Sequence, residues 1–312
     1  IELTLNTLGE NSENTKMSYR RTLEDFTSYA FDKCLDSVSW LELESVTYDM
    51  ALTFRDHLRT TKSPNDGRAL RYQSNTVNQK IFALSSIFKS LNKINSNVQS
   101  NIFEIKALKF DESKGSYGSL TDDEVERLLN YCLELPMYRK PIEKSLFFET
   151  AYVTAIRSGA LMELTWRGVR KRRDTLNNVE YNVIRIKDKG KYLEVPITDD
   201  LYGRLMMMKE IRLEQGETPS MLSERRVFPV TKKTLAKCLK QFCEHDGIDE
   251  ERNIVLHSLK KASMDTVYRE TGDITLTARH GHHTRIEMAY RHYEGKNRTL
   301  ADSARITVFN DS

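Results

Sequence analysis

The sequence predicts a mainly helical protein with one small β element, an α-rich α+β class, arranged in two domains. Three observations predict it. Apolar residues recur at helical spacing through most of the chain. One pair of short strands is joined by a turn, and a polar segment rich in Gly and Ser at 109–119 divides the chain. With 312 residues the chain is long enough for two domains of ordinary size.

The composition is that of a globular protein without a strong overall charge. The formal net charge is +3 and the sequence pI is about 8.5, with 30% charged and 39% hydrophobic residues. No apolar run approaches the length needed to span a bilayer, and no signal peptide is visible. A soluble, cytoplasmic protein without membrane association is therefore expected, and any basic surface that serves its function must be local.

The cysteine pattern favours free thiols. Cys34, Cys132, Cys238 and Cys243 form no CxxC pair, and the last two are five residues apart. This spacing favours buried, reduced thiols in a reducing compartment, with no disulfide and no zinc site.

The first domain is predicted over residues 1–108 and is all helical. Residues 1–12 are polar and are expected to be frayed. Helices are predicted from Asn14 onward, over 47–60 and over 74–92, the last with an N-cap within Ser74–Thr76. The loop between the last two helices contains the turn sequence SPNDG with lysine and arginine around it. Its composition would suit phosphate contacts, although any solvated loop has it too.

The second domain is predicted over residues 120–312, after a linker at 109–119. Thr121 and Glu124 have the spacing of a capping box, which would start its first helix. The strands 182–186 and 192–197 would form a hairpin with the lysine-rich tip 187–191. Helices are predicted over 121–135, 141–155, 158–168, 199–215 (with a core face at Met206–Met208), 230–244, 257–270 and 284–293.

Two segments hold most of the residues suited to chemistry. Residues 257–293 contain five of the seven histidines, together with adjacent lysines, arginines and tyrosines. Taken alone, such a run fits a pair of basic surface helices. Residues 149–166, ETAYVTAIRSGALMELTW, add Arg157 at the end of an apolar helix, where a charge needs a partner.

In chain order the second domain carries Arg157, Lys189, His257-x-x-Lys260, His282 and Tyr290. This order resembles the catalytic domain of the tyrosine recombinase (phage integrase) family, of the Xer and integrase type. The helices before the linker are similar to the SAM-like core-binding domain of that family, which clamps one face of the DNA. The segment 120–125, LTDDEV, resembles the start of its catalytic domain. The resemblance covers nearly the whole chain, and its motifs are specific in combination and weak singly.

The resemblance implies a role for each of these residues. Arg157 would clamp the scissile phosphate, Lys189 would protonate the leaving 5′ oxygen, and Tyr290 would be the nucleophile. His257, Lys260 and His282 would complete the phosphate pocket. The alternatives left open are Lys187 or Lys191 as the hairpin acid, His280 or His283 in place of His282, Tyr293 as the nucleophile, and a structural pairing of Arg157 with Glu163.

Two positions depart from the family pattern. Lys260 stands where the family has arginine, so it keeps the charge but loses the two-pronged hydrogen bonding that suits a phosphate. Cleavage is therefore expected to be slower or more conditional, and Lys260→Arg to preserve or raise it. Ala160 stands where the family usually has an acidic residue that orients the arginine. The sequence therefore does not identify the residue that supports Arg157.

These residue types suit the attack of a phenol on a phosphodiester. A tyrosine titrates near pKa ~10 and is a weak nucleophile unless its proton is removed or its anion is stabilised. Guanidinium and imidazole donors would stabilise the negative charge that gathers on the phosphate oxygens. No cofactor or metal is expected. The spacing of His280, His282 and His283 would allow zinc, but no nearby cysteine or carboxylate completes a set.

The resemblance thus implies a site-specific DNA recombinase. It would cleave double-stranded DNA to a 3′-phosphotyrosine, exchange 5′ ends and religate without ATP, as a homotetramer on two sites. The alternatives for its assembly are a hetero-tetramer and a complex with a host DNA-bending protein. The alternatives are an accessory DNA-binding protein that retains only the fold, and a monomeric type IB topoisomerase-like enzyme. The tail 300–312 would dock either into a neighbouring protomer or on its own domain.

Overall fold

The computed structural model describes residues 1–10, 12–63, 70–109, 117–174, 178–188, 190–283 and 285–287. The chain divides into two compact units, Ile1–Lys114 and Gly115–Ser312, and each is described by itself. The division falls inside the segment that the sequence predicts as a linker. No helix among the residues described is both long enough and apolar enough to cross a membrane.

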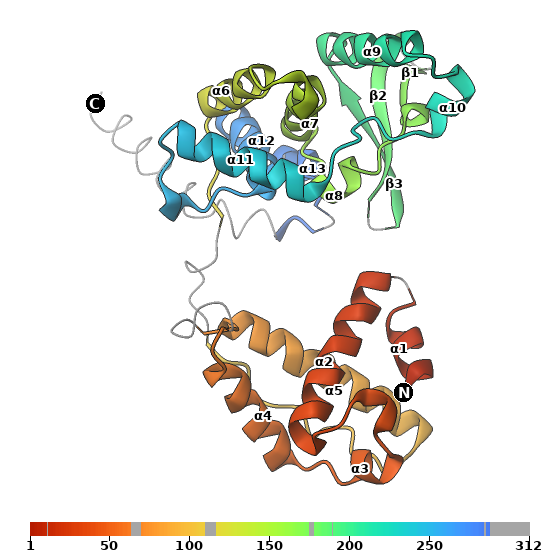
Figure 1. Ribbon diagram of the computed structural model, residues 1–312, viewed down its shortest axis with the longest axis vertical. Helices are drawn as coiled ribbons and strands as arrows, with labels where there is room; N and C mark the ends of the chain where they lie inside the picture. The colour runs from red at the N-terminus through yellow and green to blue at the C-terminus, as the bar shows by residue number, and fades with distance from the viewer. Residues whose placement is uncertain are drawn as a thin grey trace, which may run out of the picture. The chain divides into compact units, whose positions relative to one another are not determined.

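The first unit is a small helical bundle (Figure 1). Four phenylalanines, Phe26, Phe54, Phe88 and Phe103, are almost fully buried at its centre, and Phe26 meets each of the other three edge to face. Such pairs add to the stabilisation from apolar burial. Its helices are α1 (Glu2–Leu8), α2 (Glu13–Phe31), α3 (Trp40–Glu44), α4 (Tyr48–Thr60) and α5 (Ser74–Ile94).

Two predictions for this unit are wrong. The segment 1–12, predicted to be frayed, contains helix α1, and Leu5 of α1 is completely buried against the bundle and so fixes the helix. Helix α5 begins at Ser74 after Gln73, and no side chain caps it.

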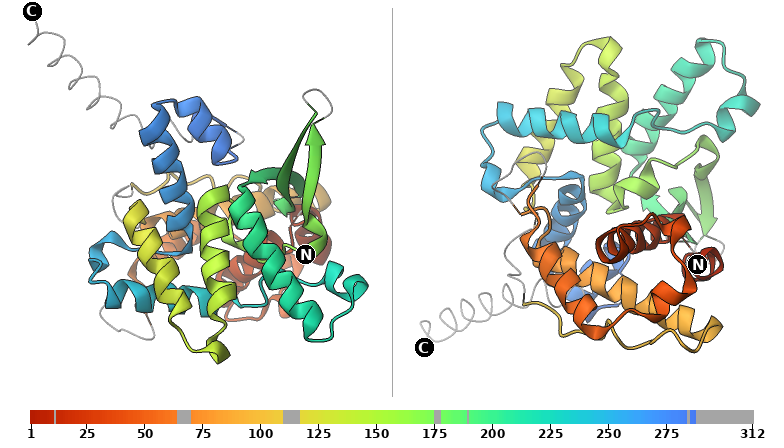
Figure 2. Two further views of the ribbon diagram at one scale, coloured as in Figure 1. Left: turned by 90° about the horizontal axis from the view of Figure 1, so that it is seen from above. Right: turned by 60° about the horizontal axis from the view of Figure 1, so that its bottom comes forward.

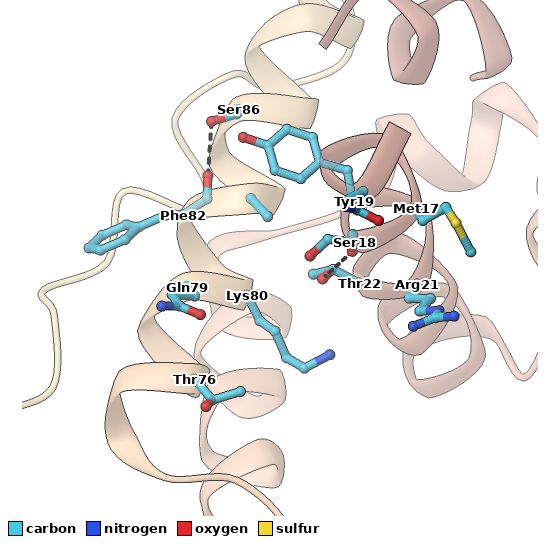
Figure 3. A pocket seen from close by; sticks show the side chains of 12 residues that line it. Met17, Ser18, Tyr19, Arg21, Thr22, Thr76, Gln79, Lys80, Phe82 and Ser86 are labelled. Atoms are coloured by element: carbon cyan, nitrogen blue, oxygen red, sulfur yellow. Dashed lines mark hydrogen bonds between the residues drawn. The ribbon is translucent and has the colours of Figure 1, made fainter. Parts of the chain in front are cut away.

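A groove of about 560 Å³ lies between α2 and α5, with Met17, Arg21, Lys80 and Phe82 among its lining residues (Figure 3). Lys80 donates to Asp25 (2.6 Å), and its ammonium lies 4.9 Å from the centre of the Tyr72 ring. Its charge is therefore already engaged within the unit. At the end of the unit, Asn78 accepts from the backbone N–H of Leu108 (2.8 Å) and donates to its carbonyl (2.9 Å), which anchors the chain just before the linker.

The second unit packs helices around one core and carries a small sheet. Thr121 and Glu124 form the predicted capping box, which starts the first helix. Asp122 accepts from Tyr152 (2.7 Å) and Thr266 (2.6 Å), which ties three helices together. The helices are α6 (Asp122–Leu133), α7 (Pro141–Thr154), α8 (Ser158–Leu161), α9 (Asp199–Glu214), α10 (Pro219–Glu224), α11 (Lys232–His245), α12 (Leu256–Thr271) and α13 (Ile274–His280).

The sheet has three antiparallel strands in the order β1-β2-β3: β1 (Val169–Asp174), β2 (Val179–Asp188) and β3 (Lys191–Ile197). Asp188 pairs with Lys191 at the predicted tip, and β2 and β3 form the predicted hairpin, which extends beyond the helices (Figure 2). The helical class with a small β element is confirmed. Strand β1 was missed because its sequence, VRKRRD, is almost entirely charged.

Other predictions in this unit fail for local reasons. The helix predicted over 158–168 ends at Leu161, because Trp166 and Leu164 bond to the backbone of 225–227 instead. Of the predicted methionine face only Met208 is buried, whereas Met207 is 64% exposed. Among the cysteines, Cys34 is exposed and Cys243 is only half-buried. Helices α10 and α13 were not predicted, and most of the helix predicted over 284–293 lies outside the described residues.

Candidate active site

Arg157 is positioned by the turn that ends helix α7. Ala155 adopts a left-handed conformation (φ 49°) and is fully buried, so the chain turns sharply before α8 begins. This turn places Arg157 at the N-cap position of α8 with its side chain 28% exposed. Its guanidinium forms an ion pair with Asp188, whose side chain is only 9% exposed.

Asp188 is the partner of Arg157 that the sequence did not identify. It is the last residue of β2, and the hairpin brings it to Arg157 from 31 positions along the chain. The alternative pairing of Arg157 with Glu163 is wrong, because Glu163 accepts instead from Arg226 (2.7 Å). The one sequence signal for this role was that Asp188 stands directly before Lys189 in the predicted hairpin tip.

We expect Asp188→Asn to lower the rate of DNA cleavage about 10–100-fold, because the neutral amide no longer holds the guanidinium in one orientation. Single-turnover cleavage of a nicked duplex measures this. Glu163→Gln is the matched control, since it removes a carboxylate that contacts Arg226 rather than Arg157. Equal losses in both variants would contradict the assigned orientation.

The hairpin lysine is not placed by the structure. Lys189 lies outside the described residues, whereas Lys187 and Lys191 are exposed on the strands that flank it. Tyr290 and its alternative Tyr293 also lie outside the described residues.

Lys260 is the most deeply buried charge of the candidate site, with 4% exposure. Its ammonium donates to the carbonyl of Ala155 (2.9 Å) and to the carbonyl of Gly281. These two carbonyls lie just before Arg157 and His282 in the chain, so one side chain joins the segments that carry both candidates. Gly281 is itself packed closely, because a Cβ there would lie 2.5 Å from the sulfur of Met264.

His282 lies next to the same segment in a left-handed conformation (φ 52°). Its Nε2 donates to the carbonyl of Thr154 (2.8 Å), which fixes the tautomer of the neutral ring. Burial lowers the pKa of His282, although its bond to Thr154 opposes the shift. The two rival histidines differ: His280 contacts the hydroxyl of Ser263 (2.6 Å), whereas Nδ1 of His283 is buried without a hydrogen-bond partner among the described residues.

His257 lies in the first turn of α12, one turn before Lys260. Burial lowers its pKa, and the cations Lys260 and Arg157 lower it further. The neutral imidazole is therefore favoured near neutral pH. Burial, Lys260 and Arg157 also lower the pKa of His283, to about 4, with smaller effects of His257 and His282. Arg157, His257, Lys260, His282 and His283 thus lie close enough to interact, and the positive charge of this cluster comes from Arg157 and Lys260.

Tyr117 is a contact of His257 that sequence reasoning missed. Its ring meets the imidazole edge to face, with 4.9 Å between centroids and 88° between planes. Lys261 donates to the Tyr117 carbonyl (3.0 Å), and its ammonium lies 5.9 Å from the centre of the Tyr117 ring. Gly118 donates to the carbonyl of Arg252 (2.6 Å). The end of the predicted linker is thus fixed to the unit that holds the candidate site.

We expect Tyr117→Ala to raise the pKa of His257 toward its ordinary value, because loss of the ring lets water reach the imidazole. Lys260, Arg157, Lys261 and His283 remain nearby, so the return will be partial. The NMR shift of the His257 Cε1–H against pH measures it. Tyr117→Phe keeps the ring and should leave the pKa unchanged, and the same shift in both variants would exclude a role of the ring.

Acid should destabilise this unit through its buried histidines. Burial lowers the pKa of His280 to about 4, helped by His282 and Lys260. Since the folded-state pKa is below the unfolded value of ~6.5, the stabilisation is complete above that pH. It is lost as the pH falls from ~6.5 to about 4, by about 1–2 kcal/mol for this partly exposed group.

Urea denaturation at pH 7.5 and 4.5 tests this expectation. His280→Gln should reduce the difference in unfolding free energy between the two pH values. His245→Gln, at the exposed end of α11, is the control and should not.

Within the described parts of the chain, no three His, Cys, Asp or Glu side chains are arranged to hold a metal ion. The cluster thus consists of cationic and imidazole groups with one carboxylate, Asp188, engaged by Arg157. Such a set is suited to hold an anion and to exchange protons with it.

A helical unit with a three-stranded sheet, in which Arg157, His257, Lys260 and His282 converge from separate segments, defines the tyrosine recombinase class of catalytic domain. The chain belongs to the phage integrase family, because the model of that family matches residues 118–299, more than half of the chain.

One similar protein is the SPbeta prophage-derived probable integrase/recombinase YopP of Bacillus subtilis (strain 168). It is 24% identical over 241 residues, which are 75% of this chain and 63% of that protein. The chain therefore spans less than two thirds of the length of this relative.

Solved structures share the fold at low identity. The XerH site-specific recombinase bound to a palindromic difH substrate matches with a TM-score of 0.64, at 19% identity over 89% of this chain and 75% of that one. The Tn1549 transposon integrase in complex with transposon right end DNA gives a TM-score of 0.57, at 15% identity, 90% of this chain and 89% of that one. A lambda integrase dimer bound to a COC′ core site matches with a TM-score of 0.56, at 15% identity over 90% of this chain and 88% of that one.

Proposed function

We propose that this protein is a site-specific DNA recombinase that cleaves and rejoins double-stranded DNA through a 3′-phosphotyrosine, in integration or excision of a mobile element or in resolution of a plasmid or chromosome. The observation that carries the proposal is the cluster of Arg157, Lys260 and the neutral imidazoles His257 and His282, in which Lys260 joins the segments of Arg157 and His282, in a chain of the phage integrase family. A phosphodiester is the anion that such a cluster would receive in DNA.

In the proposed reaction the phenolic oxygen of Tyr290 attacks the scissile phosphorus. A P–O bond to tyrosine forms, the P–O5′ bond breaks, and the 5′ oxygen takes a proton from Lys189. The phenolic proton passes to His257, whose lowered pKa leaves it neutral and able to accept near neutral pH. Arg157, oriented by Asp188, stabilises the charge on the non-bridging oxygens.

Religation is the reverse step on a new 5′ end. The incoming 5′ hydroxyl attacks phosphorus, tyrosine leaves, and one phosphoester is made for each one broken. The bond energy is kept in the covalent intermediate, so no ATP is needed.

Lys260 is proposed to position Arg157 and His282 without contacting the phosphate itself. Its two contacts with backbone carbonyls favour a positioning role over direct phosphate clamping. The Nε2–H of His282 donates to the carbonyl of Thr154, so only a protonated ring would have a second N–H, on Nδ1, to donate to the phosphate. His283 is the rival donor, since no described residue satisfies its buried Nδ1.

The proposed partner is double-stranded DNA, and the proposed assembly is a homotetramer on two sites in the cytoplasm, alone or with a host DNA-bending protein. The XerH, Tn1549 and lambda proteins named above were solved with DNA, which supports this partner.

A nicked duplex that carries the recombination site of the encoding element tests the proposal. Cleavage next to the nick releases a short fragment that carries the free 5′ hydroxyl, so religation is prevented and a covalent adduct accumulates. An adduct that survives SDS and disappears on protease treatment is the expected result. Tight DNA binding without an adduct would indicate an accessory factor, and relaxation of supercoils at any sequence a topoisomerase; either outcome would overturn the proposal.

A further inference from the structure

A strongly basic cavity lies near the N-terminal ends of α7 and α11, two helices labelled in Figure 1. Its volume is about 380 Å³. Among the described residues that line it there is no Asp or Glu. The polar lining consists mainly of Arg139, Lys140, Lys144, Lys237, Thr231 and Thr234.

Lys144 is the residue that points to a ligand. It lies in α7 with 2% exposure, and its ammonium makes no hydrogen bond or ion pair with any residue that the structure describes. Its ammonium therefore lines the cavity without a counter-charge, and a bound anion would form a charge-assisted hydrogen bond with it. By contrast, Arg139 donates to Gln241 and Lys140 donates to the carbonyl of Pro229, each at 2.8 Å. An anion in the cavity would supply what Lys144 lacks.

The positive charge around this cavity also acts on the thiol of Cys238. Cys238 lines the cavity, and its Sγ lies 3.8 Å from Sγ of Cys132. The hydrogen bond with Cys132 lowers the pKa of Cys238, and Lys144 and Arg139 add to the shift. The space therefore favours negative charge.

The N-terminus of helix α11 borders the same cavity, which Thr231 and Thr234 line. Thr231 caps this 14-residue helix by accepting from the N–H of Thr234 (3.1 Å). The N–H groups of Lys232 and Lys233 have no acceptor within the helix. They lie at the positive end of the helix dipole, which favours phosphate groups.

We propose that this cavity is a phosphate-binding site separate from the candidate cleavage site. Lys144 and Thr154 are ten positions apart on α7, about 15 Å along the helix. The volume is larger than one phosphate needs, so the group would be part of a larger molecule. The source is either the backbone of bound DNA or a small phosphorylated compound.

Calorimetric titration with inorganic phosphate tests the site directly. The wild-type protein should bind phosphate saturably, and Lys144→Met and Lys237→Gln should each weaken binding at least about tenfold, which is ~1.4 kcal/mol. Lys240→Gln, on the same helix but outside this cavity, is the control and should bind as wild type does. Because Lys237 is exposed, its variant carries the test if Lys144→Met fails to fold.

Binding of a random 30-base-pair duplex, followed by fluorescence anisotropy across salt concentrations, separates the two sources. If a backbone phosphate occupies the cavity, Lys237→Gln should reduce the slope of log K against log salt by about 1. An unchanged slope together with lost phosphate binding indicates a small phosphorylated ligand. The proposal is overturned if both variants bind phosphate and duplex as Lys240→Gln does. Neither assay requires strand cleavage, so the result is independent of the function of Tyr290.

Discussion

Tyr290→Phe is expected to abolish the covalent adduct with nicked DNA while leaving the affinity for that DNA within about twofold. The phenyl ring keeps the shape of the side chain but has no oxygen to attack phosphorus, so no phosphoester can form. Gel electrophoresis in SDS measures the adduct, and anisotropy measures DNA binding. The assignment of Tyr290 comes from its place in the sequence, because it lies outside the described residues.

Tyr293→Phe is the matched control for this prediction. It removes a phenol three residues further along and should keep the adduct at the wild-type level. If adduct formation is instead lost in Tyr293→Phe and retained in Tyr290→Phe, the two roles are exchanged. Retention in both variants would show that neither tyrosine is the nucleophile.

Lys260→Met should destabilise the second unit by about 2–4 kcal/mol, because two buried carbonyls lose a charged donor. Cleavage should fall by at least about 100-fold even where the protein remains folded, since Arg157 and His282 are no longer held together. Urea denaturation measures the first effect, and single-turnover cleavage at low temperature measures the second. Lys240→Met, on the exposed face of α11, is the control for the loss of a lysine charge.

Lys260→Arg separates positioning from phosphate clamping. The family resemblance alone predicts that arginine preserves or raises cleavage. The structure changes this expectation, because the larger guanidinium must fit a space in which lysine is 4% exposed. Overpacking of this kind costs about 1–3 kcal/mol. Faster cleavage at unchanged stability would mean that Lys260 contacts the phosphate itself.

The elements that the sequence predicts well are those with a strong local pattern. The apolar stripe of α5, the capping box at Thr121 and the β2–β3 hairpin each depend on neighbours within a few residues. Strand β1 and the break after Leu161 depend on pairing with distant backbone, and a charged edge strand has no apolar alternation to reveal it. Helix α1 was missed because its polar sequence hides one fully buried leucine.

The same division holds at the candidate site. Arg157, His257, Lys260 and His282 were proposed from motifs, and the structure brings them into one cluster. The contacts that orient these residues were not predictable: Asp188 reaches Arg157 through strand register, and Tyr117 reaches His257 from a segment that the sequence predicts as linker. The carbonyl contacts of Lys260 carry no sequence signal, because any residue supplies a carbonyl.

The two anchored residues that flank the linker limit how far apart its ends can lie. Asn78 holds Leu108 to the first unit, and Lys261 holds Tyr117 to the second. Nine residue steps separate these points, so they can never be more than about 32 Å apart. On the side of the second unit this tether ends at Tyr117, so the residue that bounds the reach of the linker is also the one whose ring meets His257 edge to face.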